Sequence, residues 1–186
     1  MVAWNIRSAK AALKYPTENV TSMHYIHAID YLVYGYMQAD NAAGAANAFN
    51  GVKPHHPIQA TFPAAYALST IPARLALESH NWQQASQLNT RNPSYIPWDK
   101  FPQVEAITYF ARGLGAAKMN DLSAAQANIK KLDELYSKTL AISPNYWAIL
   151  VDAQRQTVAA WMNYAQGHKK EALDQLIKAA DLEDSL

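Results

Sequence analysis

Three side chains that could bind a metal stand one helical turn apart in the first part of the sequence. His24, His27 and Asp30 follow one another at intervals of three. Residues three apart on a helix share a face, and imidazole and carboxylate groups are ligands for transition metals. The pair His55-His56 could add ligands from a loop. The alternative is that His27 and Asp30 pair with each other or with polar neighbours, and the absence of an HExxH motif favours it.

Other catalytic signatures are missing from the sequence. It contains no GxSxG, no Gly-rich phosphate loop before Lys-Ser/Thr and no GxGxxG that follows a strand. Gly113-Leu114-Gly115 lies within a predicted helix, where close helix packing explains it better. The chain has no cysteine, which excludes disulfides, thiolate catalysis and Cys-type zinc sites. We therefore expect no catalytic residue, no resident metal and no cofactor, and we keep a metal-dependent or acid/base enzyme using His24, His27 and Asp30 as the alternative.

Composition narrows the possible partners further. The 186 residues carry a formal net charge of +1, half of them are hydrophobic and only 17% are charged. A balanced charge gives no reason to expect binding to nucleic acid or to an anionic membrane. No apolar run approaches the roughly 20 residues that span a bilayer. We expect neither a nucleic-acid partner nor a membrane span.

The elements that must position these residues are helices, because apolar residues recur at steps of three and four almost throughout. Asp121 is a candidate N-cap, Ser143-Pro144 is another, and Gly167 stands where a helix needs a left-handed residue to end. Loops are expected at 52–60 and 92–102. The predicted helices lie near 3–14, 21–39, 41–51, 61–79, 81–89, 102–119, 121–141, 144–166 and 168–182.

Four turns between predicted helices resemble one another, at 40–45, 80–85, 120–125 and 167–172. Each has a small or polar turn and then an alanine one turn into the second helix. These anchor alanines are Ala45, Ala85, Ala125 and Ala172, which stand 40, 40 and 47 residues apart. Twelve residues before the anchors stand Val33, Ala73, Gly113 and Ala160. Pro57, Pro97 and Pro144 follow the first three anchors. A fixed spacing of this kind is the signature of a helical repeat.

The pattern resembles the tetratricopeptide repeat, which has a small residue in its first helix, a turn, an alanine in its second helix and a closing proline. Two longer stretches look like a bacterial group of uncharacterised tetratricopeptide-repeat proteins. They are His-Ala-Ile-Asp-Tyr-Leu-Val-Tyr-Gly-Tyr at 27–36 and Pro-Trp…Ala-Ile-Thr-Tyr-Phe-Ala-Arg-Gly-Leu-Gly-Ala-Ala at 97–117. The sequence departs from the family in three ways. The intervals between its repeats exceed the usual repeat length of about 34 residues. Arg7 stands at the alanine position of the first unit, and the Trp-Leu-Gly signature is degenerate.

The resemblance implies an all-α fold, a right-handed α-α superhelix of about four helical hairpins with a partial hairpin before them. The whole of 1–186 would form a single repeat domain. Its units would cover about 21–52, 61–92, 102–141 and 144–182, after a partial unit at 1–15. The sequence begins as if inside an amphipathic helix and stops just after the last expected helix, and we expect it to be a piece of a longer protein.

In tetratricopeptide arrays the first helices line a concave surface, and the resemblance places a set of polar and aromatic side chains there. Arginine and aromatic side chains dominate binding energy at interfaces, and arginine can bind a carboxylate through two parallel hydrogen bonds. The alternative is an internal polar network that fixes helix packing. The predicted binding residues are His27, Asp30, Tyr34, Arg74, Arg112, Gln154, Arg155 and Trp161, and the same faces also carry Gln38, Thr70, Glu78, Phe110, Lys118 and Tyr164.

These observations predict a binding or scaffold module that recognises a peptide, a protein segment or a small ligand. Self-association through exposed repeat ends is a further possibility, because truncated solenoids expose apolar end faces. The tryptophans of the repeat turns, Trp4 and Trp82, are expected in the core. Tyr95 and Trp98 in the proline-rich loop are expected to staple neighbouring repeats or to form a lid. The sequence leaves the cellular location open, with a small preference for the cytoplasm, since a targeting signal could lie outside this chain.

Overall fold

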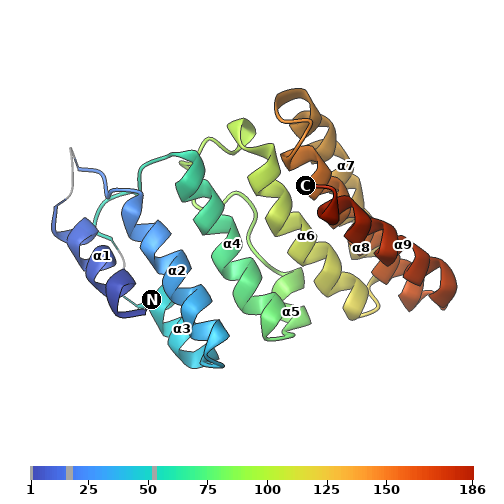
Figure 1. The fold of residues 1–186 in the computed structure, drawn as a ribbon, viewed down its shortest axis with the longest axis horizontal. Coiled ribbons are helices and arrows are strands. Elements are labelled where there is room, and N and C mark those ends of the chain that lie inside the picture. Colours follow the sequence, from blue (N-terminus) through green and yellow to red (C-terminus); the bar gives the residue numbers. More distant parts are fainter. Residues whose placement is uncertain (1, 16–18, 52–53) are drawn as a thin grey trace. The chain divides into compact units, whose positions relative to one another are not determined.

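The computed structural model describes residues 2–15, 19–51 and 54–186. Within these ranges the chain forms nine α-helices, one short 3-10 helix and no β-strand (Figure 1). The predicted all-α class is therefore confirmed. Three positions that the sequence predictions cover lie outside the described residues. They are residue 1 of the predicted partial unit and residues 52 and 53, which belong to the end of the first predicted unit and the start of the predicted loop 52–60. None of the described helices is both long and apolar enough to cross a bilayer.

The chain divides into two compact units, and the first comprises Met1–Ser79 with Asn92–Pro97. It contains α1 (Val2–Lys14), α2 (His24–Gln38), α3 (Ala42–Asn50) and α4 (Phe62–Glu78). Helix α2 is central, because it packs against α1, α3 and α4. Its side chains Leu32 and Val33 are buried together with Ile71 of α4 and Ala45 of α3.

The second unit comprises His80–Arg91 with Trp98–Leu186. It contains α5 (Trp82–Ser86), the 3-10 helix η1 (Trp98–Lys100), α6 (Pro102–Lys118), α7 (Leu122–Ile142), α8 (Trp147–Ala165) and α9 (Lys169–Asp184). Helix α6 packs against α5, α7 and α8, and α9 packs against α8. The buried side chains between these helices include Ile129, Leu132, Val151 and Val158.

The four repeat turns share a left-handed backbone residue immediately before the N-cap. These residues are Asp40, His80, Asn120 and Gly167, with φ angles of 53°, 51°, 64° and 90°. Asx residues and glycine adopt this conformation most readily. The first three N-caps, Asn41, Asn81 and Asp121, each accept a hydrogen bond from the backbone N–H three residues on, and His168 makes no side-chain cap. The predicted roles of Asp121 and Gly167 are confirmed.

The repeat spacing is also visible in burial. All four anchor alanines, Ala45, Ala85, Ala125 and Ala172, are at most 1% exposed. The four positions twelve residues earlier are buried as well: Val33, Ala73, Gly113 and Ala160. Three of these four residues are small and let neighbouring helices approach closely. The described residues therefore form a repeat-like array of helices.

Three predicted helix boundaries were wrong. Helix α2 begins at His24 and not at residue 21, because the backbone of Thr21 forms an isolated parallel bridge with Ile58. Helix α5 ends at Ser86, three residues before the predicted end. Helix α8 begins at Trp147, and Ser143, expected to cap it, instead ends α7 by donating its N–H to the Thr139 carbonyl at 2.8 Å.

Candidate functional site

Helices α2 and α4 of the first unit bring the largest group of predicted binding residues together. The two helices pack side by side (Figure 1). On α2, His27, Asp30 and Tyr34 fall at steps of three and four and therefore share a face. A cavity of about 290 Å³ opens here, and we call it the α2–α4 cavity. It is lined by His27, Asp30, Tyr31, Tyr34, Tyr66 and Arg74.

A salt bridge between the two helices lies within this cavity. Arg74 Nη1 donates to Asp30 Oδ1 at 2.5 Å, and the two side chains are only 18% and 12% exposed. Arg74 Nε also lies 3.8 Å from Glu78 Oε1, one turn further along α4. The guanidinium carbon lies 5.5 Å from the ring centroid of Tyr34. The predicted residues Asp30, Tyr34 and Arg74 therefore form one contiguous group.

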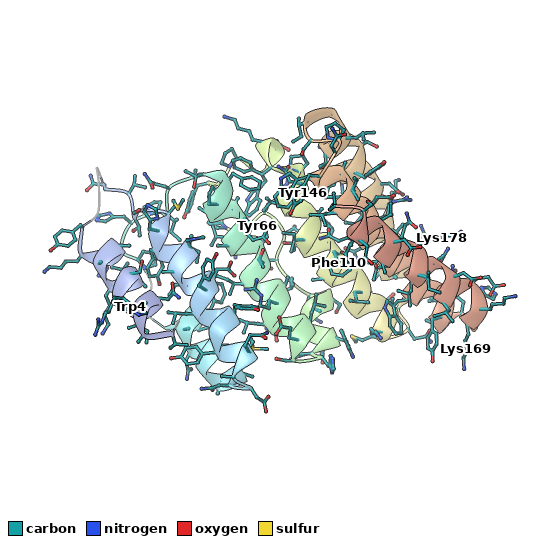
Figure 2. All side chains as sticks on the ribbon, viewed as in Figure 1. Trp4, Tyr66, Phe110, Tyr146, Lys169 and Lys178 are labelled. Atoms are coloured by element: carbon teal, nitrogen blue, oxygen red, sulfur yellow. The ribbon has the colours of Figure 1, made fainter. Side chains whose placement is uncertain are left out.

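Aromatic rings surround this ion pair. Tyr31 and Tyr34 of α2 are 46% and 42% exposed. His27 meets Tyr31 edge to face, with ring centroids 5.0 Å apart. Tyr66 comes from the first half of α4 (Figure 2). Exposed tyrosines beside a largely buried ion pair offer apolar contact area together with hydroxyl donors and acceptors.

The α2–α4 cavity does not have the ligand set of a metal site. Nowhere in the described part of the chain do three or more His, Cys, Asp or Glu side chains gather in a way that could hold a metal ion. The carboxylate of Asp30 is engaged by Arg74, while His24 and His27 are exposed on α2. The geometry therefore supports the alternative in which Asp30 pairs with a polar neighbour, which is Arg74.

Arg155, predicted as a binding residue, lies in an ion-pair network within the second unit. Its Nη2 donates to Asp152 Oδ1 at 2.6 Å, and its Nη1 donates to Asp133 Oδ1 of α7 at 3.0 Å. Burial lowers the pKa of Arg155, but the hydrogen bonds and charges of the two aspartates raise it further than burial lowers it. With two carboxylates already bound, Arg155 matches the internal-network alternative better than a free binding group.

Arg112 and Gln154 are also turned toward the protein. Arg112 Nη1 donates to the backbone carbonyl of Leu88, two residues after the end of α5. Arg112 Nε and Gln154 Oε1 are buried without a hydrogen-bond partner among the described residues. Their geometry favours a role in fixing helix packing.

Trp161 lines a second cavity, of about 570 Å³, which we call the α6–α8 cavity. Its lining is Ala117, Lys118, Asn120, Trp161, Tyr164 and Ala165. Lys118 Nζ lies 2.8 Å from the Trp161 ring centroid. Trp161 and Tyr164 meet at a centroid distance of 5.4 Å. Trp161 is thus placed at an opening of the second unit, as the predicted binding role requires.

An ion pair at the start of α6 was not predicted from the sequence. Arg91 donates from Nε to Glu105 Oε1 at 2.8 Å and from Nη2 to Glu105 Oε2 at 3.0 Å. Its Nη2 also donates to Asp99 at 2.7 Å. The Glu105 side chain is 5% exposed. The only sequence signal is an acidic residue in the first turn of a helix, and it does not identify the partner.

The proline-rich loop contributes a staple and a core residue. The backbone N–H of Ile58 donates to the hydroxyl of Tyr95 at 2.9 Å, within the first unit. This contact supports the staple alternative for Tyr95. Trp98 is 4% exposed in the second unit. Of the tryptophans expected in the core, Trp4 is instead 72% exposed, and Trp82 is half-buried beneath the ring of His80.

The chain matches no family model, no curated protein and no solved structure.

Proposed function

We propose that the chain is a tetratricopeptide-like binding module and that the α2–α4 cavity receives a peptide or protein segment. The observation that carries the proposal is the pair of exposed tyrosines, Tyr31 and Tyr34, that line the cavity beside the largely buried Asp30–Arg74 pair. Tyrosine provides a large contact area at low entropic cost, and its hydroxyl can pair with backbone groups of a bound segment.

The charges of the cavity indicate which kind of segment fits. Arg74 is already paired with Asp30 and lies near Glu78, so two carboxylates face one guanidinium. A ligand carboxylate would have to compete with them. The cavity therefore suits a neutral or basic segment, and bidentate binding of a ligand carboxylate by Arg74 is disfavoured.

The repeat pattern supports the architectural half of the proposal. Four buried anchor alanines follow four left-handed turns with a common register. A superhelical arrangement of these hairpins, with a concave surface formed by first helices, remains part of the proposal. In such an array α2 and α4 would both be first helices, which is where a ligand surface is expected.

A peptide screen tests the binding role. Random dodecamer peptides are selected on the wild-type protein, and their affinities are compared for wild type and Tyr31→Ser/Tyr34→Ser. We expect the double variant to lose at least about tenfold in affinity, because truncated hot-spot tyrosines cost over 1 kcal/mol each. Tyr146→Ser is the matched control, since Tyr146 is similarly exposed at 50% but belongs to the second unit. Selected peptides that bind the double variant as tightly as the wild type would contradict the proposal.

We propose end-to-end self-association as a second function, because the first and last helices carry opposite net charge. Helix α1 carries Arg7, Lys10 and Lys14 and no acidic residue. Helix α9 carries five acidic and three basic residues. Both expose apolar side chains: Trp4 on α1 (Figure 2), and Leu173 and Ile177 on α9, which are 59% and 52% exposed.

A further inference from the structure

Among the methionines that the structure describes, Met119 is the one whose side chain is largely open to solvent. It stands at the end of α6 and is 49% exposed. Met23 and Met37 are partly buried against the core of the first unit, and Met162 is partly buried against that of the second. Because an oxidant must reach the thioether sulfur, Met119 is the described methionine that a peroxide reaches most readily.

The end of α6 also holds Met119 beside α5, which packs against this helix (Figure 1). The backbone N–H of Met119 donates to the Gly115 carbonyl at 3.1 Å, so the two residues share a face of α6. At Gly115 this face lies directly on α5, since an added Cβ would come within 2.7 Å of the Ser86 nitrogen. One turn further on, the Met119 sulfur lies 3.9 Å from the hydroxyl oxygen of the same serine. The sulfur is therefore accessible to solvent and adjoins a hydrogen-bond donor.

The hydroxyl of Ser86 has a single proton and two acceptors within reach. Its Oγ lies 2.8 Å from the Gln83 carbonyl oxygen and 3.9 Å from Met119 Sδ. A thioether sulfur is a weak acceptor, so the carbonyl holds the proton while the sulfur is reduced. Oxidation converts the thioether into a polar group, whose oxygen is a much stronger acceptor because the S–O bond is highly polar. An oxidised Met119 therefore offers Ser86 a new partner and adds a link between α5 and the end of α6.

We propose that Met119 is a site of oxidation to methionine sulfoxide by peroxides and that Ser86 binds the sulfoxide oxygen. A lone pair of Sδ attacks one peroxide oxygen and forms the S–O bond while the O–O bond breaks. With hydrogen peroxide, the second oxygen leaves with the electron pair of the O–O bond and takes the proton of the transferred oxygen. The sulfur is oxidised, the peroxide is reduced, and the products are the sulfoxide and water.

The position of Met119 connects this chemistry to the rest of the second unit. Lys118 and Asn120, its neighbours along the chain, both line the α6–α8 cavity. A new bond from Met119 to Ser86 would therefore restrain the backbone that carries two of the lining residues. This inference uses the second unit alone and does not depend on the proposed role of the α2–α4 cavity.

Site-resolved oxidation kinetics test the reactivity of Met119. The full chain is treated with dilute hydrogen peroxide, catalase stops the reaction, and peptide mass spectrometry gives the initial rate at each methionine. We expect Met119 to react at least about threefold faster than Met23, Met37 or Met162, because packing shields the other three sulfurs. In the chain unfolded in urea the four rates should converge. A rate at Met119 in the folded protein no greater than those of the other three would overturn the inference.

Thermal melting after limited oxidation tests the role of Ser86. The Tm of the wild type should rise by about 1–4 °C, because one added hydrogen bond stabilises a domain of this size by roughly that amount. In Ser86→Ala the Tm should not rise, although Met119 is still oxidised. Met119→Leu, which conserves the volume of the side chain, reports the effect of oxidation at every other residue and should keep its Tm. Circular dichroism verifies that both variants are helical. Equal changes of Tm in the wild type and in Ser86→Ala would show that Ser86 does not bind the sulfoxide and would overturn that half of the inference.

Discussion

At the scale of single residues, Glu105 is a buried charge whose loss should lower stability. It is almost fully buried at the start of α6 and accepts two hydrogen bonds from Arg91. In Glu105→Gln the buried acceptor loses its charge and one of its two paired contacts. We expect the free energy of unfolding to fall by about 2 kcal/mol, since hydrogen bonds to charged groups contribute about 1.5–3 kcal/mol. Denaturant titration followed by circular dichroism measures the change.

Asp99→Asn is the control for this prediction, because Asp99 binds the same guanidinium from an exposed position. Hydrogen bonding from Arg91 lowers the pKa of Asp99, so this carboxylate is charged at pH 7. Solvent screens exposed pairs, and we expect little loss of stability. Equal losses in the two variants would show that burial of Glu105 does not govern the interaction.

At the scale of elements, two glycines on α6 report how closely helices approach in the second unit. A Cβ built on Gly115 would lie 2.6 Å from the Trp82 carbonyl oxygen and 2.7 Å from the Ser86 nitrogen, both backbone atoms of α5. A Cβ on Gly113 would instead meet the Val158 side chain at 2.8 Å and Asn128 Cβ at 3.1 Å. Backbone cannot move aside as a methyl group can, and the two sites therefore differ.

We expect Gly115→Ala to destabilise the protein by about 1–3 kcal/mol, because overpacking outweighs the roughly 0.5–1 kcal/mol that alanine contributes within a helix. Gly113→Ala, two residues away on the same helix, should cost less because Val158 can change rotamer. Thermal melting of both variants checks the order. A Gly115→Ala protein as stable as Gly113→Ala would show that α5 yields to the added methyl group.

The elements also show how far the sequence predicts this molecule. Helix spans and three of the turns follow from local signals, such as the Asx caps at Asn41, Asn81 and Asp121. The start of α2 was mispredicted because it depends on a bridge between Thr21 and Ile58 that no local pattern reveals. Long-range pairing is set by packing, which a single sequence does not show.

The contacts in the cavities and ion pairs also divide into those that local spacing predicts and those that depend on how helices pack. Helical spacing places His27, Asp30 and Tyr34 on one face of α2, and the register derived from the resemblance selected Arg74. The ion pair that joins Asp30 to Arg74 spans 44 residues and depends on how α2 meets α4. Likewise, the contact of Arg155 with Asp152 is visible as an i,i+3 spacing, whereas its contact with Asp133 is not. Side-chain partners within a helix were predictable, and partners between helices were not.

At the scale of the whole molecule, the faces of α1 and α9 make self-association testable by exchanging their charges. Trp4, Arg7 and Lys14 stand at helical spacing on α1, and Asp174, Ile177 and Asp181 do so on α9. We expect the weight-average mass in sedimentation equilibrium to rise with protein concentration. The rise should weaken in about 0.5 M salt, where charge interactions are screened.

Charge exchange decides whether these two faces cause the association. Arg7→Glu/Lys14→Glu makes α1 acidic, and Asp174→Lys/Asp181→Lys makes α9 basic, so each variant alone has end faces of like charge and should remain monomeric. In an equimolar mixture the acidic α1 of one variant meets the basic α9 of the other, and the two unaltered ends also match. Association should therefore return in the mixture. If the wild type associates but the mixture stays monomeric, the contact lies elsewhere on the surface. If the wild type itself stays monomeric at its highest attainable concentration, the self-association proposal is wrong.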